Sequence, residues 1–150
     1  MEFNYLPSDV QAEFASVLHE HITNAERILK SDKCILPMLA IYADNPAENE
    51  LIGLQPAGKN ADTDAAFRCV IKTLSGKQFK TAVFSYSTQI VLKEDNVLYD
   101  VVKTYIMKKD GTAAIFYTPY YISGFLKKKV LYKSTIIDEI TDNFFGLHTT

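Results

Sequence analysis

Histidines are the first residues to consider for chemistry, because imidazole is both a general base near neutral pH and a frequent metal ligand. His19 and His21 flank Glu20, and His148 lies close to the last residue. On a helix, residues two apart point about 200° from one another, so His19 and His21 cannot hold one metal ion together. A zinc-protease helix would place its histidines four residues apart. His21 falls on an apolar stripe, which predicts a hydrogen-bonded histidine at the edge of the core.

Acidic and nucleophilic side chains show no catalytic pattern. Asp44, Glu48 and Glu50 share one polar stretch, but the spacing and the central glycine of a calcium-binding loop are absent, which favours a solvated loop. The six glycines are scattered singly, so the sequence contains neither a phosphate-binding loop nor a dinucleotide-binding loop. Cys34 and Cys69 lie in apolar segments and are expected to be buried, reduced thiols. We therefore expect no metal and no cofactor, and the sequence leans against an enzyme.

An aromatic and basic patch is the first surface that the sequence singles out. Aromatic rings beside lysines can stack on bases and neutralise phosphates, as single-strand nucleic-acid binders do. Adjacent lysines are more often a solvated turn, however, and strand aromatics commonly pack in a core, so we do not expect nucleic acid as the partner. The patch comprises Tyr117, Tyr120, Tyr121, Phe125, Lys127, Lys128 and Lys129.

The elements that must position these residues are clearest between residues 79 and 121, where the sequence predicts three successive antiparallel strands. Between Lys80 and Leu92, the even positions are mostly apolar or aromatic and the odd positions mostly carry hydroxyl or amide groups. Alternation with a period of two predicts a strand with one covered face and one wetter face. A polar turn is predicted at residues 93–96, and Asp110 with Gly111 predicts a tight hairpin turn.

The odd face of the first of these strands is the second candidate surface. It carries no charge between Thr81 and Val91, although strands that face water normally carry charges that block association. Such a face suits packing against another subunit, sheet or helix better than it suits water. An alternative cover is a C-terminal helix that crosses over within the chain. The predicted partner face comprises Thr81, Val83, Ser85, Ser87, Gln89 and Val91.

Helical and further strand patterns flank the central strands. A first helix is predicted from Ser8 to Lys30, a second from Asp62 to Gly76, and a third from Ser134 or Thr135 to Gly146. Residues 34–44 and 51–54 are predicted to form a hairpin of two strands, and residues 130–133 a further short strand. The predicted order is therefore helix, two strands, helix, three strands, a short fourth strand and a helix.

This order predicts a single α+β domain over residues 1–150, with one mainly antiparallel sheet of about five strands and helices packed on one of its faces. The order is similar to that of the profilin-like scaffolds, in particular the roadblock and longin type of small domain. This resemblance covers most of the chain and implies a dimerising interaction platform. It concerns the order of the elements alone, so no residue of those families is carried across.

Charge is unevenly distributed along the chain. Residues 1–64 contain 4 basic and 11 acidic side chains, residues 65–134 contain 12 and 4, and the last sixteen residues contain none and 3. This asymmetry can orient a charged partner or a second copy of the chain, or the two halves can neutralise one another within one domain. The first residues lack a signal-peptide pattern, and no apolar run reaches the length of a membrane span, so we expect a cytoplasmic protein.

These observations lead to competing functional expectations. We expect a non-catalytic protein-interaction or adaptor domain whose partner is a protein, with a second copy of the chain as one candidate. An immunity-type neutralising protein fits the same profile. The competing expectation is a small-ligand binder or an enzyme with a pocket between the sheet and the first helix, lined by His21, Tyr86 and Tyr105.

Overall fold

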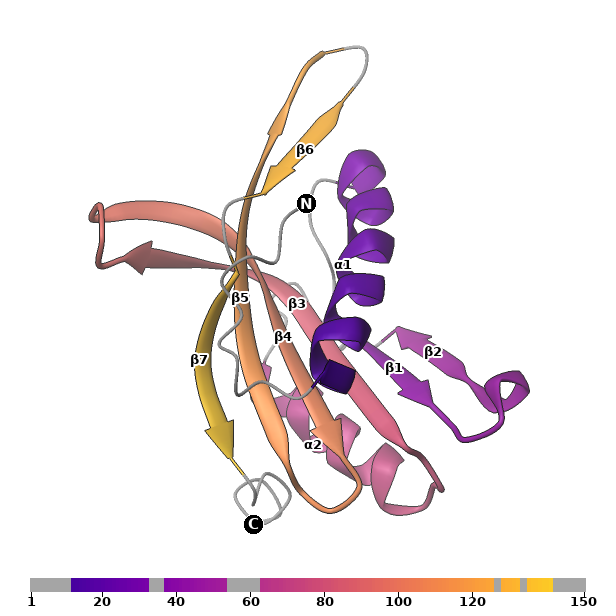
Figure 1. Cartoon of the computed structure of the whole chain (residues 1–150). Helices are drawn as coiled ribbons and strands as arrows, with labels where there is room; N and C mark the ends of the chain where they lie inside the picture. The colour runs from indigo at the N-terminus through magenta and orange to yellow at the C-terminus, as the bar shows by residue number, and fades with distance from the viewer. Residues whose placement is uncertain (1–11, 33–36, 54–62, 126–127, 133–134, 142–150) are drawn as a thin grey trace.

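The computed structural model describes residues 12–32, 37–53, 63–125, 128–132 and 135–141 (Figure 1). The predicted helix start at Ser8, the second helix cap at Asp62, Cys34, Lys127 and His148 lie outside these residues. Within the described residues the order of elements is α1 (Ala12–Asp32), β1 (Met38–Tyr42), a 3-10 turn (Pro46–Glu48), β2 (Glu50–Gly53), α2 (Thr63–Ser75), β3 (Thr81–Leu92), β4 (Val97–Lys108), β5 (Ala113–Ser123), β6 (Lys129–Tyr132) and β7 (Ile136–Thr141).

The strands form one curled sheet in which every described pair is antiparallel. The order across the sheet is β2-β1-β3-β4-β5, and both β6 and β7 pair with the outer edge of β5. β6 pairs with Tyr120–Ser123 and β7 with Ala113–Tyr117, so the two short strands follow one another along the same edge. The predicted α+β class with an antiparallel sheet is confirmed, and neither described helix is long and apolar enough to cross a membrane.

Residues 136–141 form strand β7 rather than the predicted C-terminal helix. The isoleucines of this segment fit a helical stripe, but β-branched side chains also favour a strand, and a window of six residues does not distinguish the two periods. The free edge of β5 supplies hydrogen-bonding partners that a local pattern cannot reveal. The hydroxyl of Thr135, predicted to cap a helix, instead lies 3.1 Å from the hydroxyl of Thr118 in a buried contact.

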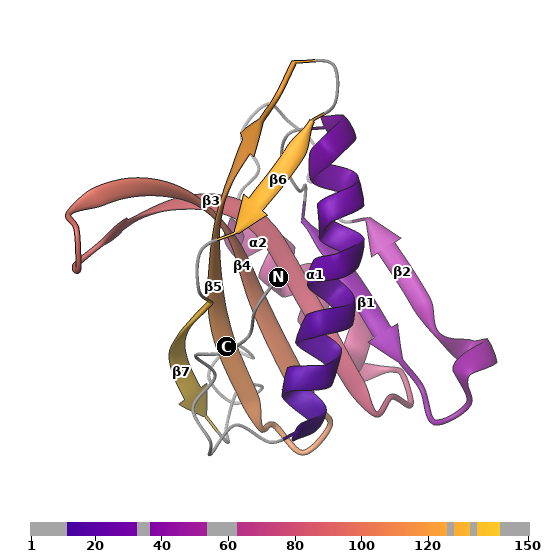
Figure 2. The same cartoon turned by 45° about the horizontal axis from the view of Figure 1, so that its top comes forward.

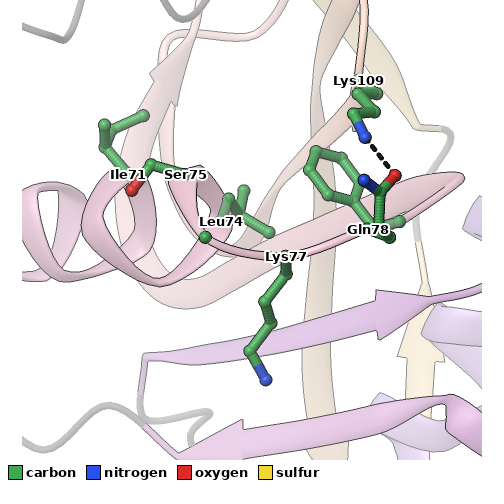
Figure 3. A pocket seen from close by; sticks show the side chains of 8 residues that line it. Ile71, Leu74, Ser75, Lys77, Gln78 and Lys109 are labelled. Carbon is green, nitrogen blue, oxygen red and sulfur yellow. Dashed lines mark hydrogen bonds between the residues drawn. The ribbon is translucent and has the colours of Figure 1, made fainter.

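α2 covers one face of the sheet. Its apolar side packs against even-numbered residues of β3, including Ala82 and Phe84, and against Tyr105 of β4. The ring of Phe67 meets the rings of Phe84 and Tyr105 edge-on, with centroids 5.1 and 4.8 Å away. At the other end of the helix, Leu74 is buried beside a pocket where the chain turns back toward β3 (Figure 3).

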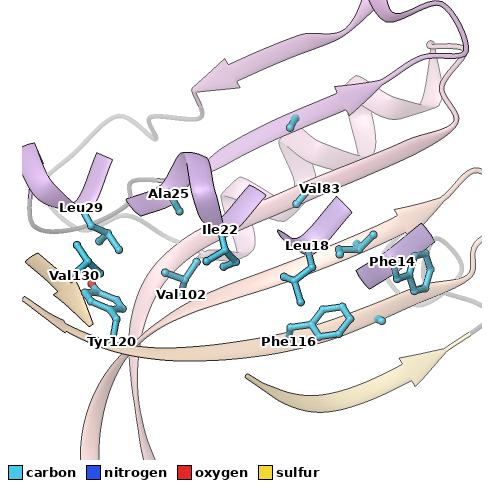
Figure 4. Packing of buried hydrophobic residues seen from close by; sticks show 13 residues of the cluster. Phe14, Leu18, Ile22, Ala25, Leu29, Val83, Val102, Phe116, Tyr120 and Val130 are labelled. Atoms are coloured by element: carbon cyan, nitrogen blue, oxygen red, sulfur yellow. The ribbon is translucent and has the colours of Figure 1, made fainter. Parts of the chain in front are cut away.

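α1 covers the opposite face, so the helices lie on both sides of the sheet and not on one side as predicted (Figure 2). A single stripe of α1 packs on odd-numbered Val83 of β3 and on Val102 and Ile106 of β4 (Figure 4). Both faces can be covered because the odd and the even positions of β3 and β4 both carry apolar side chains in the part of the sheet near β1 and β5. The stripe comprises Phe14, Leu18, Ile22, Ala25 and Leu29, each at most 2% exposed.

Two hairpins project from the sheet (Figure 1): one extends beyond the helix-covered part, and the other packs one of its faces against α1. β3 and β4 pair along their whole length, but β1 reaches only Ser85 of β3 and β5 reaches only Asp100 of β4. Residues 86–92 of β3 therefore do not pair with β1, and residues 97–99 of β4 do not pair with β5. We call the hairpin of residues 86–99 the arm. The second projection is the β5–β6 hairpin, in which Tyr120–Ser123 pair with Lys129–Tyr132.

Candidate functional site

Half of the predicted partner face is covered by α1. Thr81, Val83 and Ser85 are 4%, 0% and 0% exposed, so these three side chains cannot reach a partner. Their small and uncharged character reflects packing beneath a helix of the same chain. The helix that covers this face is α1, and not the C-terminal helix that the sequence suggested. Alternation along a strand shows that one face is covered, but it does not show which element covers it.

The remainder of that face lies toward the arm. Ser87 is half-buried, and its hydroxyl lies 3.3 Å from the hydroxyl of Tyr120. Gln89 is exposed and donates to Asp100 across the strand pair at 3.0 Å, and Val91 is 55% exposed. The open part of the predicted partner face is therefore the part carried by the arm.

His21 anchors α1 to the sheet. Its Nε2 atom lies 2.7 Å from the hydroxyl oxygen of Ser85, and both side chains are buried. Burial lowers the pKa of His21 to about 4, so the ring is neutral at physiological pH. Because Ser85 has no exposed surface, this pair joins a helix to a strand rather than presenting a nucleophile to solvent.

The three residues of the predicted ligand pocket do not meet. His21 contacts Ser85 on the α1 side, and the next residue along the strand, Tyr86, must point to the other face because strand side chains alternate. Tyr86 stacks on Tyr105 there, with ring centroids 6.5 Å apart, on the face that α2 covers. A pocket between α1 and the sheet thus cannot be lined by either tyrosine.

A half-buried lysine that sequence reasoning missed lies among these tyrosines. The β-sheet register places Lys103 directly opposite Tyr86 on β3 and Tyr117 on β5. Its ammonium group is 5.1 Å from the ring centroid of Tyr105 and 5.2 Å from that of Tyr117, within the range of cation–π attraction. Burial alone lowers the pKa of Lys103, but hydrogen bonds to the hydroxyls of Tyr105 and Tyr117 raise it by more, so the group stays charged. Only the strand register reveals this cluster.

The aromatic and basic patch separates into unlike environments. Tyr120 is 5% exposed and packs against the α1 side, whereas Tyr117 lies half-buried beside Lys103 on the other face. Tyr121 and Phe125 are 59% and 93% exposed on the β5–β6 hairpin. Lys128 is half-buried and Lys129 exposed in the same hairpin. The patch is therefore not one continuous aromatic surface.

A groove runs between α1 and the β1–β2 hairpin, with a volume of about 470 Å³. Apolar side chains line part of it: Ala25 and Ile28 from α1, and Met38 and Ala40 from β1. Polar side chains line the rest, and these are Glu20, His21, Asn24 and Arg27 from α1, Tyr42 from β1, Asn49, and Glu50 from β2. This volume is in the range of small-molecule sites.

A second cavity of about 420 Å³ lies at the C-terminal end of α2 (Figure 3). Ile71, Leu74 and Phe79 line it together with two lysines. Lys77 is ion-paired with Glu50 of β2, and Lys109 donates to the side-chain oxygen of Gln78. Because both ammonium groups already have partners within the chain, this cavity offers less unpaired charge than the groove.

Ion pairs also show how the uneven charge is used. Lys77 with Glu50, and Lys108 with Glu13, each join the basic middle of the chain to its acidic first part. Such pairs favour neutralisation within one molecule. Cys69 is exposed on α2, contrary to the expectation of a buried thiol, because it is turned by about 100° around the helix axis from the buried Val70.

Exposed apolar side chains concentrate on the projections. Val91 and Leu98 are directly opposite one another on the arm and are 55% and 57% exposed. The tip between them is ordered by Asp95, which accepts hydrogen bonds from the backbone of Val97 at 3.1 Å and from the hydroxyl of Tyr99 at 2.6 Å. The arm is thus a defined strand pair that presents an apolar cross-strand pair to water.

Comparison with known proteins adds no identification. No family model, no curated protein and no solved structure matches this chain. Among the described residues, no three histidine, cysteine or carboxylate side chains converge as metal ligands would. The class that the fold defines is an α+β protein built on a curled antiparallel sheet.

Proposed function

We propose that this chain is a non-catalytic protein-interaction domain and that its partner covers the arm. The observation that carries the proposal is the exposure of Val91 and Leu98, at 55% and 57%, on a strand pair that no described helix covers. Fully burying a valine or leucine side chain is worth about 1.5–3 kcal/mol, so covering this pair would contribute a useful part of a binding free energy. A two-stranded ribbon alone is also marginally stable in water, and a partner would support it.

A second copy of the chain is the partner that we propose. The arm tip carries Lys93 beside Glu94 and Asp95, so two arms in a two-fold arrangement can bring opposite charges together. The order from α1 to β5 is helix, two strands, helix and three strands. This is the order that resembles the roadblock and longin domains, which mostly act as dimerising platforms. An immunity-type neutralising protein would use the same arm toward a foreign chain.

Sedimentation of a charge-substituted arm tests the proposal. Val91→Lys with Leu98→Lys should convert a dimer into a monomer while the helical and sheet signals in circular dichroism persist, because two ammonium groups oppose burial of the arm. Leu51→Lys with Ile140→Lys is the matched control, since these strand residues are 69% and 48% exposed elsewhere on the sheet. The control should remain dimeric.

Two results would count against self-association. Monomeric sedimentation of the unmodified protein at high micromolar concentration excludes the homodimer. Equal dissociation of the arm variant and the control would mean that added charge, rather than the arm, is responsible.

A further inference from the structure

The groove between α1 and the β1–β2 hairpin has charged groups at two separate places. Glu20 of α1 and Tyr42 of β1 both line the groove, and burial and then the Glu20 carboxylate raise the pKa of the Tyr42 hydroxyl. Among the described residues, Glu20 has no ion-pair partner, whereas Glu50 on the opposite rim is paired with Lys77. The groove therefore holds an unpaired carboxylate next to an aromatic ring.

The positive group of the groove lies further along the same helix. Arg27 follows Glu20 by seven residues, which at 1.5 Å per residue is a separation of about 10 Å along the axis. Among the described residues, no ion pair joins the guanidinium of Arg27 to the carboxylate of Glu20. Between these two residues of the helix, His21, Asn24 and Ala25 line the groove, and Met38 and Ala40 line it from β1.

We propose that this groove binds a zwitterion whose ammonium and carboxylate groups are separated by an extended, largely apolar stem. The ammonium group lies between the Glu20 carboxylate and the face of the Tyr42 ring, the carboxylate is bound by Arg27, and the stem lies on Ala25, Met38 and Ala40. Each contact is a standard one: a charge-assisted hydrogen bond, a cation–π contact, an arginine–carboxylate pair and apolar burial. The inference concerns a different face of the molecule from the arm and does not depend on self-association.

The required separation of charges suits two kinds of molecule. A short peptide of three residues spans about 10 Å between its ends when extended. An aliphatic ω-amino acid of similar length presents the same two charged ends without peptide groups. Both kinds share the chemistry that the groove recognises, and Asn24 and Asn49 could add hydrogen bonds only to the peptide.

Calorimetric titration of the purified full chain tests the proposal with ω-aminooctanoic acid and trialanine as probes. Octylamine and octanoic acid, which each lack one charged end, are the matched ligands. We expect at least one zwitterion to bind more tightly than either single-charge ligand by about tenfold or more, since a charge-assisted contact is lost in each case. Tighter binding of trialanine would identify a peptide, and tighter binding of ω-aminooctanoic acid an aliphatic amino acid.

Two substitutions assign the ends. Glu20→Gln should weaken octylamine and zwitterion binding by about tenfold, and Arg27→Gln should reduce zwitterion affinity to that of octylamine without changing octylamine binding. Glu48→Gln, an exposed carboxylate of the neighbouring turn that does not line the groove, should change neither. The proposal is overturned if no probe binds at low millimolar concentration, or if binding is the same in Glu20→Gln as in the unmodified chain.

Discussion

Acidification should loosen the contact between α1 and the sheet, because His21 accepts a proton in the unfolded chain at a higher pH than in the folded chain. The folded pKa is about 4, compared with 6.5 for an ordinary histidine, and the cause is burial of the ring against Ser85. Above pH 6.5 the ring is neutral in both states and no stability is lost. As the pH falls from 6.5 toward 4, the unfolded state binds the proton first and the free energy of unfolding decreases.

The size of the effect follows from the difference between the two pKa values. One pKa unit corresponds to 1.36 kcal/mol, so the loss is about 2 kcal/mol at pH 5 and roughly 3 kcal/mol at pH 4, where it approaches its limit. Such a loss is a large fraction of the stability of a domain of this size.

Urea denaturation at several pH values measures this contribution. His21→Gln keeps a polar side chain near Ser85 but cannot titrate, so the difference between the two proteins isolates His21 from all other groups. We expect the difference in the free energy of unfolding between the unmodified chain and His21→Gln to change by about 2 kcal/mol from pH 7 to pH 5, because only the unmodified chain loses stability through residue 21. His19→Gln, on the exposed side of the same helix, is the matched control. Parallel pH profiles for the unmodified chain and His21→Gln would refute the argument that burial holds this histidine neutral.

Two further predictions concern the order of the arm and the packing of α1. Asp95→Ala should speed amide hydrogen exchange at Val97 and Tyr99, because it removes two hydrogen bonds at the tip of the arm. The expected loss of local stability is about 1–3 kcal/mol. Unchanged exchange would mean that the strands alone order the turn. Leu18→Ala should lower the free energy of unfolding by about 2–5 kcal/mol, whereas Leu98→Ala, half-exposed on the arm, should change the stability of the monomer by less than about 1 kcal/mol. Urea denaturation of the two variants at low protein concentration compares them, and equal losses would contradict the assignment of Leu98 to an uncovered surface.

Local patterns in the sequence located several elements well, because their causes are local. The apolar stripe predicted a helix that the structure places at Ala12–Asp32, and the alternation between Lys80 and Leu92 predicted the strand at Thr81–Leu92. The turn at Asp110 and Gly111 is present, with a positive φ of 96° at Gly111 and the Asp110 carboxylate accepting from the backbone of Thr112 at 2.9 Å. Periodicity and turn chemistry depend on neighbouring residues, so they can be read from the sequence.

The candidate sites were less predictable, because they depend on which elements meet. Alternation along β3 separated Ser85 from Tyr86, but whether α1 or α2 covers each face follows from the packing of the whole sheet. For the same reason, His21 could not be matched to Ser85 in advance, and Tyr86 and Tyr105 were assigned to the wrong helix. The cluster around Lys103 depends on the register of three strands, which no single strand specifies.

The sequence by itself determined the class of the fold, the position of α1 and the hairpin built from β3 and β4, since each follows from local periodicity and turn residues. Only the tertiary structure decided that the helices lie on opposite faces, that residues 136–141 pair with β5, and that the arm extends beyond both neighbours. A hydrophobic stripe must be buried, but it does not specify its partner. The partner of each stripe is decided by the one arrangement of elements that buries all the stripes together and pairs the available strand edges.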